Sequence, residues 1–277
     1  MKLSRRMLGA ALGAVVATGV ATSGWAQSAT QELSSESVIE TIKQDGVIRI
    51  GLSLFVPWSM RDKNGDLIGY ELDVGRKLAE DMGVEVEFVP TAWDGIIPAL
   101  VAGNFDVIIS GMSMTAQRNL TINFTDPYAY SGLAILANKE LTAGMTLEDY
   151  NNPEVTFVAR RGATPAVVIA ANFPDATLLL FDEDGASTQE VLNGNAHASM
   201  AAQPTPNRDA AKYPDTLVVP FESLYDQRGE AFGLRKGDPD ALNFFNNWIA
   251  QNWRSGWLKE RHDYWFAGNE WADQVAQ

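Results

Sequence analysis

The sequence contains no cysteine, and histidine is scarce, with two residues in 277. The absence of cysteine excludes disulfides, thiolate metal sites and a lipid-anchored cysteine behind a leader segment. One of the two histidines, His197, is interpreted as a structural strand residue, because the sequence around it holds no cluster of metal-ligating side chains. We therefore expect no metal, no cofactor, and a product that is free in its compartment.

Basic residues are also in short supply. The chain has 21 Lys and Arg against 35 Asp and Glu, a formal net charge of −14. Residues 1–26 contain three basic residues and no acidic one, so the remainder carries about −17. This charge argues against nucleic acid as a partner and against long-range attraction of anions. An anionic solute would have to be captured by local groups.

Long apolar runs are missing everywhere except at the N-terminus. Lys2, Arg5 and Arg6 precede an apolar segment that ends in small residues at Ala26, which predicts a cleaved export signal over residues 1–26. The basic start favours general secretion over the twin-arginine route. No later run approaches the ~18 apolar residues that span a membrane. We expect the mature protein in the periplasm.

Strand and helix patterns alternate along the rest of the chain, which predicts an α/β fold with a mostly parallel sheet covered by helices. The first set comprises strands at Val47–Leu52, Val84–Val89 and Val107–Ser110 and helices at Tyr70–Met82 and Trp93–Ala102. A smaller set follows over residues 156–200. Two extended segments, Gly132–Asn138 and Phe221–Glu230, are interpreted as crossovers. We assign 27–133 to the first part of lobe 1, 134–221 to lobe 2, and 222–277 to a return to lobe 1 with C-terminal helices, whose tryptophans we interpret as packing.

The most informative segment is residues 106–128, DVIISGMSMTAQRNLTINFTDPY. A short buried strand leads to Gly111, which permits close backbone approach, and then to Ser113 and Thr115, residue types that cap helices. Arg118 follows on the first turn. A helix start offers N–H donors, and a guanidinium is a two-pronged donor, so the segment suits a small carboxylate. The alternative is an ordinary surface arginine.

The whole block resembles the first lobe of the polar amino-acid class of bacterial solute-binding proteins, the receptors of ABC importers known as extracellular solute-binding protein family 3. The resemblance rests on Pro57-Trp58, Asn64-Gly65, Gly69-Tyr70-Glu71-Leu72-Asp73, Trp93, Ile96-Ile97-Pro98-Ala99-Leu100, Ser113, Thr115, Arg118, Phe124 and Pro127-Tyr128. It extends from about Val47 to Phe266. It implies a two-lobed periplasmic-binding-protein (Venus flytrap) fold with two crossover hinges.

The resemblance also implies where a solute would bind. Arg118 would pair with the solute carboxylate, helped by Ser113 and the amide near Gly111, and the aromatic walls would be Phe55 and Trp93, unless these two are core aromatics. In lobe 2, Gly162 is kept, but Ala163 stands where the family has a threonine. The predicted ligand-binding residues are Phe55, Trp93, Ser110, Gly111, Ser113, Arg118, Arg160, Ala163 and Thr164. Arg160 is equally interpretable as a solvated charge at the end of a strand.

One departure from the family pattern bears on the solute. Where the family has a glycine, an aspartate and then the aspartate that binds the α-ammonium, this chain has His197 and Ala202 at the two acidic positions, and Ser53 and Leu54 replace an acid near the first strand. A buried ammonium beside Ala202 would lack a counter-charge. We therefore expect a carboxylate whose recognition does not depend on a primary α-ammonium.

The leading hypothesis is a monomeric periplasmic receptor that presents a small carboxylate-bearing solute, a polar amino acid or a derivative, to an ABC permease in the inner membrane. The rival is an enzyme on the same scaffold, of the cyclohexadienyl dehydratase type. Residues 201–205 offer no carboxylic acid where those enzymes carry their glutamate, so we expect no catalysis. A ligand-sensing ectodomain is disfavoured because no membrane-spanning segment follows.

Overall fold

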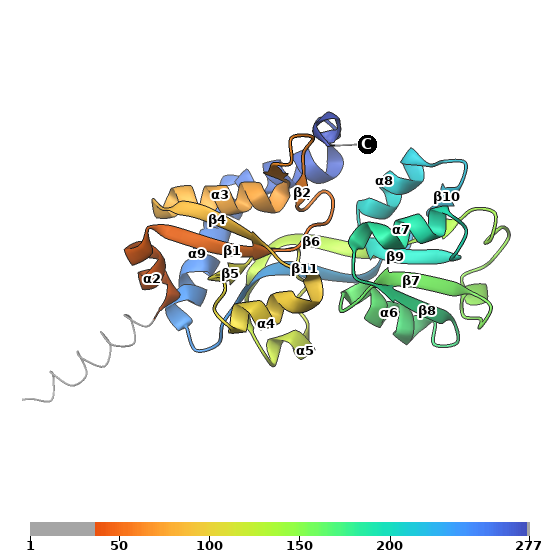
Figure 1. Ribbon diagram of the computed structural model, residues 1–277, viewed down its shortest axis with the longest axis horizontal. Helices are drawn as coiled ribbons and strands as arrows, with labels where there is room; N and C mark the ends of the chain where they lie inside the picture. The colour runs from red at the N-terminus through yellow and green to blue at the C-terminus, as the bar shows by residue number, and fades with distance from the viewer. Residues whose placement is uncertain (1–36, 276–277) are drawn as a thin grey trace, which may run out of the picture.

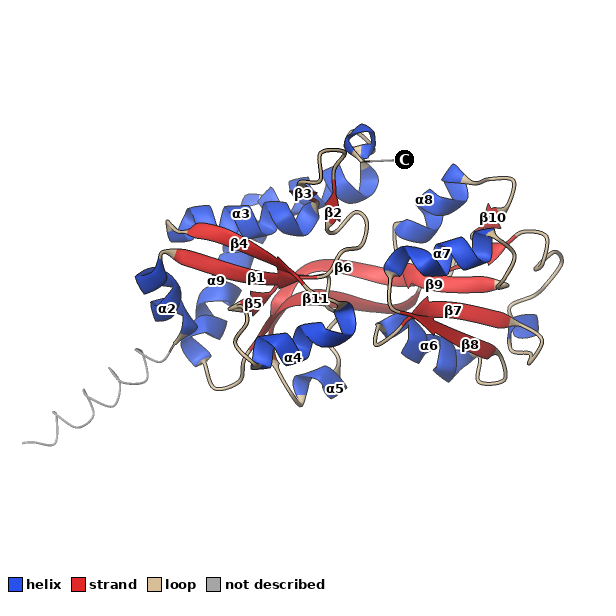
Figure 2. Ribbon diagram, viewed as in Figure 1, coloured by secondary structure: helices blue, strands red, loops and turns tan. Residues whose placement is uncertain are grey.

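Two lobes lie side by side along the longest axis of the molecule, and two long strands run from one lobe into the other (Figures 1 and 2). This computed structural model describes residues 37–275. The predicted signal at 1–26 lies outside the described residues. The long strands are β6 (Asn123–Asn138) and β11 (Tyr225–Leu234), which pair antiparallel. They make one nine-stranded sheet of both lobes, in the order β4-β1-β5-β11-β6-β9-β7-β8 with β10 paired to β6.

The first lobe is built on β1 (Val47–Leu52), which pairs in parallel with β4 (Glu85–Pro90) on one side and β5 (Val107–Ile108) on the other. Helices α3 (Tyr70–Met82), α4 (Ile96–Val101), α5 (Ala116–Asn119) and α9 (Pro239–Ser255) surround this part of the sheet, together with α2 (Val38–Asp45), the 3₁₀ turn η1 (Trp93–Gly95) and a small β2–β3 hairpin (Met60–Arg61, Leu67–Ile68). Helix α3 illustrates how such a helix covers the sheet, because Tyr70, Val74 and Leu78 recur every four residues on one face and are fully buried. Parallel strands leave their carboxyl ends at one edge, facing the second lobe.

The second lobe repeats the pattern at a smaller scale. Strands β7 (Thr156–Arg160), β8 (Thr177–Phe181) and β9 (Ala198–Ala202) are mutually parallel, and β9 pairs antiparallel with β6. The covering helices are α6 (Thr164–Asn172), α7 (Asp184–Leu192) and α8 (Thr205–Lys212), with β10 at Leu217–Val218 and the 3₁₀ turn η2 at Glu148–Tyr150. Phe157 and Ile169 belong to a buried cluster of this lobe, which is separate from the clusters of the first.

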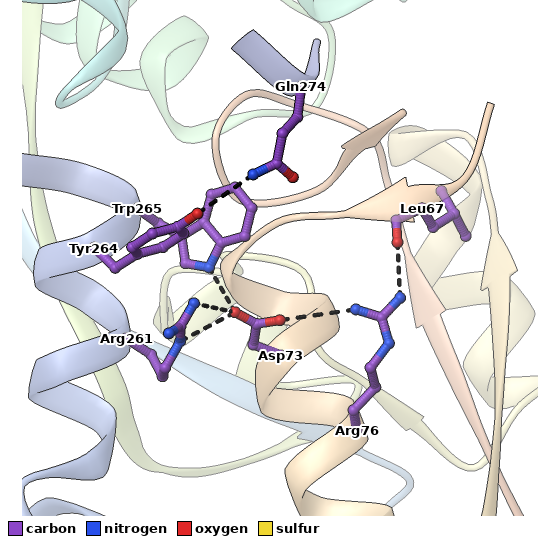
Figure 3. Close-up of polar contacts among 7 residues, drawn as sticks. All are labelled: Leu67, Asp73, Arg76, Arg261, Tyr264, Trp265 and Gln274. Atoms are coloured by element: carbon purple, nitrogen blue, oxygen red, sulfur yellow. Dashed lines mark hydrogen bonds and ion pairs between the residues drawn. The ribbon is translucent and has the colours of Figure 1, made fainter. Parts of the chain in front are cut away.

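The C-terminal segment packs on the first lobe through α10 (Trp257–His262), the π-helical turn η3 (Asp263–Ala267) and the 3₁₀ turn η4 (Ala272–Gln274). Figure 3 shows the polar contact that fastens it: Asp73 Oδ2 on α3 accepts hydrogen bonds from Arg261 Nε at 3.1 Å, Arg261 Nη2 at 2.8 Å and Trp265 Nε1 at 2.7 Å. Trp265 and Trp271 are buried in the core of this lobe. These tryptophans are packing residues, as the sequence indicates.

Three predictions about the fold need correction. The crossovers expected at Gly132–Asn138 and Phe221–Glu230 are not bare connections, because most of each belongs to β6 or β11 within the sheet. The sheet is consequently mixed rather than mostly parallel. The helix predicted over Trp93–Ala102 starts as η1 and becomes α4 only at Ile96. The two-lobed α/β architecture itself is confirmed.

Candidate functional site

A cavity lies between the lobes, at the carboxyl ends of the parallel strands. Both lobes contribute to its wall, as the position of strand ends predicts for an open α/β sheet. Its lining residues from the first lobe and the central strands include Phe55, Trp58, Trp93, Gly111, Ser113, Leu133 and Glu230. Those from the second lobe include Arg160, Ala163, Thr164, Pro165, Ser187, Thr188, Met200, Ala202 and Thr205.

Aromatic rings form much of the first-lobe wall. Phe55 and Trp58 stack with ring centroids 5.5 Å apart. Gly111 lies against them with a positive φ of 50°, and a Cβ atom placed there would be 2.5 Å from Phe55 Cζ. Glycine is required at this position for both reasons, since other residues would be strained and would collide. Phe55 therefore lines the cavity and also packs against Trp58 and Gly111.

Ser110 and Gly111 are both held by hydrogen bonds within the first lobe. The Gly111 N–H donates to the Tyr128 hydroxyl at 2.9 Å, and that hydroxyl donates to Glu71 Oε1 at 2.8 Å. Ser110 is fully buried, and its Oγ accepts from Ser53 N–H at 2.8 Å. The Gly111 amide is thus bonded to Tyr128, and the help of an amide near Gly111 in binding a solute carboxylate stays a prediction.

Arg118 lies beside the cavity and bridges the lobes. Its backbone N–H is capped by Thr115 Oγ1 at 3.1 Å, while its guanidinium donates to Ser113 O at 2.9 Å and across the gap to Gly162 O at 3.2 Å. Among the described residues it forms no salt bridge with a carboxylate. Burial, and secondarily the charge of Arg228, lowers the pKa of Arg118 to about 10. It therefore remains a cation at neutral pH, partly desolvated, and its side-chain hydrogen bonds go to carbonyl oxygens.

Trp93 is in contact with both predicted cations. The guanidinium carbon of Arg118 lies 5.3 Å from the centroid of its ring and that of Arg160 lies 5.6 Å from it, within the range of cation–π attraction. Arg160 also reaches across the gap, donating to Ser53 Oγ at 2.8 Å. Trp93 thus holds two guanidinium groups from different lobes at one end of the cavity.

The start of α6 forms the second-lobe wall. The Ala163 N–H closes a turn on Arg160 O at 3.2 Å. Ala163 is the N-cap residue of α6 and has no side chain that can cap the helix. Thr164 is buried at the first helical position and lines the cavity. A helix of nine residues thus presents an N-terminus without a side-chain cap to the cavity.

Of the two residues that replace the family's aspartates, one lies at the cavity and the other does not. Ala202 lines the cavity. His197 does not, and its Nδ1 accepts from Thr156 N–H at 3.1 Å, which supports the structural interpretation. Thr205 adds a third bond between the lobes, from its Oγ1 to Val56 O at 2.9 Å. Over residues 37–275 no group of three His, Cys, Asp or Glu is arranged to hold a metal ion.

Sequence reasoning missed Glu230. This carboxyl is 2% exposed, lines the cavity, and accepts from Ser131 Oγ at 2.5 Å. The register of β11 against β6 shifts between Glu230 and Ala231, an irregularity of the kind that redirects side chains near functional sites. An acid inside an apolar strand sequence, Glu-Ala-Phe-Gly-Leu, is the signal that could have identified it, because strands buried on both sides seldom carry a charge.

Comparisons with known proteins agree with this geometry. The model of the bacterial extracellular solute-binding proteins, family 3, matches residues 48–268. The L-cystine-binding protein TcyJ of Escherichia coli K12 is 26% identical over 241 residues, covering 86% of this chain and 90% of that protein. Cyclohexadienyl dehydratase of Pseudomonas aeruginosa is 26% identical over 234 residues, covering 84% of this chain and 87% of that protein. A protein from Wolinella succinogenes DSM 1740, solved in complex with lysine, is 36% identical with a TM-score of 0.78. The match covers 82% of this chain and 99% of that protein.

Proposed function

This chain belongs to the family 3 bacterial extracellular solute-binding proteins, and from that premise we propose that it captures a small carboxylate-bearing solute, an amino acid or an amino-acid derivative, between its lobes. The closed protein then presents the solute to the permease of an ABC importer. Solute contacts to both lobes favour the closed state, which is a shift of population between open and closed conformations. The chain is a periplasmic protein in this proposal, and it acts as a monomer.

The observation that carries the proposal is the position of Arg118. Its guanidinium is partly desolvated, it contacts both lobes, and within the described chain it has carbonyl oxygens but no carboxylate as partners. Buried charges in proteins are normally paired, and a planar guanidinium is suited to two-pronged pairing with a carboxylate. The helix N-terminus at Ala163 adds a positive electrostatic contribution from the other lobe.

A thermal-shift screen of the purified mature protein tests this function. The panel contains the common L-amino acids, L-cystine, and simple mono- and dicarboxylates. We expect a subset of carboxylates to raise the melting temperature in a concentration-dependent manner, because a ligand that binds only the folded state stabilises it. Calorimetry then gives the affinity of each hit. If no carboxylate in the panel raises the melting temperature of the folded protein, the proposal is wrong.

A second candidate is a dehydratase acting on a cyclohexadienyl carboxylate. The absence of an acid at residues 201–205 no longer argues against it, because Glu230 supplies a carboxyl to the cavity and burial raises the pKa of that carboxyl to about 8. A general acid must hold its proton at working pH. We favour binding without chemistry, since the family is one of solute-binding proteins. Incubation with a cyclohexadienyl substrate decides between them: formation of an aromatic product, lost in Glu230→Gln, would establish catalysis.

A further inference from the structure

Glu230 is a cavity residue whose partners within the protein are incomplete. Its Oε1 accepts the Ser131 hydroxyl at 2.5 Å, while its Oε2 is buried and has no hydrogen-bond partner among the described residues. Its backbone is fixed on both sides, because Ala231 N–H donates to Met112 O at 3.2 Å and Met114 N–H donates to Gly229 O at 3.3 Å. The side chain is therefore held at the junction of the two lobes by a rigid strand.

No cation of the described residues forms a salt bridge with Glu230. The two guanidinium groups in or beside the cavity are engaged elsewhere, that of Arg118 with two carbonyls and that of Arg160 with Ser53 Oγ and Asp182 O. A buried carboxyl with an unsatisfied oxygen is costly, because desolvation of a polar group is not repaid by a new bond. Such a group on a cavity wall is suited to a donor that arrives with the solute.

The rest of the wall around Glu230 offers no competing acid. Phe55, Trp58, Met200 and Ala202 are apolar, and Ala202 stands at one of the two positions where the sequence departs from the family by lacking an aspartate. Glu230 thus lines the cavity and Arg118 lies beside it, against Ser113 and Trp93, and this acid and cation are not bonded to each other. This arrangement is complementary to a solute that carries both charges.

We propose that Glu230 accepts a hydrogen bond from a protonated nitrogen of the solute, so that the cavity selects zwitterionic solutes that present a carboxylate to Arg118 and an ammonium or substituted ammonium to Glu230. This inference rests on the proposed function, because it names the solute class of the same cavity. It revises the expectation drawn from Ala202. The counter-charge missing from β9 is supplied by β11, on the opposite side of β6.

Proton release is the distinguishing signature of this role. Burial raises the pKa of Glu230 to about 8, while the Ser131 hydrogen bond opposes the shift. The ionisable groups that interact with it are Glu71 and Tyr70 of α3, and both pKa values are themselves raised by burial. Most Glu230 carboxyls are thus protonated at pH 7. A solute ammonium at Oε2 favours the carboxylate, so binding of a cationic nitrogen must release about one proton, whereas binding of a plain carboxylate must not.

The test compares matched solutes by calorimetry at pH 7 in two buffers of different ionisation enthalpy. The first series is L-lysine, L-norleucine, 6-aminohexanoate and hexanoate. These share a six-carbon carboxylate chain and carry amino groups at C2 and C6, at C2 alone, at C6 alone and at neither carbon. The second is L-cystine and its deaminated analogue, 3,3′-dithiodipropanoate. We expect at least one nitrogen-bearing member to bind tenfold or more tightly than its deaminated counterpart, about 1.4 kcal/mol, and to release a proton on binding.

Three variants sharpen the result. Glu230→Gln should abolish both the proton release and the preference for nitrogen, and Ser131→Ala, which keeps the carboxyl, should retain proton release with weaker binding. Glu222→Gln, an exposed acid outside the cavity, is the matched control and should behave as wild type. Because the proton count is measured first on the wild-type protein, the test does not depend on the variants folding.

The outcomes separate the inference from the proposed function. Equal binding of the deaminated solutes, or nitrogen preference without proton release, overturns the role of Glu230 and leaves a carboxylate receptor intact. Retention of the preference in folded Glu230→Gln also overturns it. If none of these solutes binds, the inference is wrong for the classes tested, and the wider thermal-shift screen still decides the proposed function.

Discussion

The guanidinium of Arg118 in the first lobe donates a hydrogen bond to the carbonyl of Gly162 in the second, across 3.2 Å. Two further bonds join the lobes beside the cavity, from Arg160 to Ser53 Oγ and from Thr205 to Val56 O. All three therefore connect lobes that must separate for a solute to enter. Arg118 and Arg160, which we predict to bind the solute, thus also join the lobes, so changes in affinity and in the open–closed equilibrium should be measured together.

Replacement of Arg118 by alanine is the most direct test of the carboxylate site. Removing one partner of a buried charge pair commonly costs about 2–5 kcal/mol, so affinity for the tightest carboxylate of the screen should fall at least thirtyfold. Arg161→Ala is the matched control, because Arg161 is exposed and pairs with Asp182 at 2.8 Å outside the cavity. Calorimetry measures both, and circular dichroism verifies the fold. Wild-type affinity in Arg118→Ala would place the carboxylate elsewhere.

Trp93 should report on solute binding because two guanidinium groups lie over its ring, at 5.3 and 5.6 Å from the centroid. A solute that draws either guanidinium group away from the ring changes the electric field at the indole. We expect Trp93→Phe to remove most of the solute-induced change in tryptophan fluorescence and to weaken binding by about 0.5–2 kcal/mol, the span of cation–π energies. Trp257→Phe, on α10 behind the first lobe, should keep the full response. An unchanged signal in Trp93→Phe would show that the solute does not reach this ring.

The sequence predicted the helices and strands well where apolar periodicity was strong. Helix Tyr70–Met82 and strand Val47–Leu52 have the predicted bounds. Gly69 and Gly83 flank the helix, and Gly46 directly precedes the strand. The sequence could not show that β6 and β11 continue through both lobes, since a long strand and a strand followed by an extended linker share one pattern. It also missed α8, where Pro204 and Pro206 flank a polar first turn.

The sequence indicated where the site residues lie better than it indicated their hydrogen-bond partners. Phe55, Trp93, Ser113, Arg160 and Thr164 all line one cavity, because turn residues after parallel strands converge at one edge of the sheet. Ser110 and Arg118 are not among the residues that line it. Which amides are free for a solute depends on neighbours distant in sequence. Tyr128 lies 17 residues from Gly111, and no local pattern reveals that contact. The role of each predicted residue in binding a solute stays a prediction.

The contact in Figure 3 predicts how the C-terminal helices are held. Arg261 donates two hydrogen bonds to Asp73 and lies 4.5 Å from the Tyr264 ring centroid. Hydrogen bonds to charged groups contribute about 1.5–3 kcal/mol, so Arg261→Ala should lower the free energy of unfolding by that amount. Lys259→Ala on the same helix removes an exposed pair with Asp263 and should cost less than about 0.5 kcal/mol. Urea denaturation of both variants measures the difference, and equal losses would contradict the assignment.

Glu71 predicts how stability depends on pH. It is fully buried on α3, where burial raises its pKa from the ordinary 4.5 to about 8. The folded protein therefore keeps a proton that the unfolded chain releases above about pH 4.5. Its contribution to stability is fully present below that pH and is lost progressively as the pH rises toward 8.

Glu71→Gln removes this titration while its side-chain oxygen still accepts from the Tyr128 hydroxyl. The melting temperature of Glu71→Gln, measured relative to wild type, should therefore rise between pH 5 and pH 8 and change little above that. Glu80→Gln, exposed on the same helix, should show no such trend. Differential scanning calorimetry at several pH values compares the three proteins. A difference between Glu71→Gln and wild type that is constant from pH 5 to pH 8 would mean that Glu71 ionises in the folded protein as readily as in the unfolded chain.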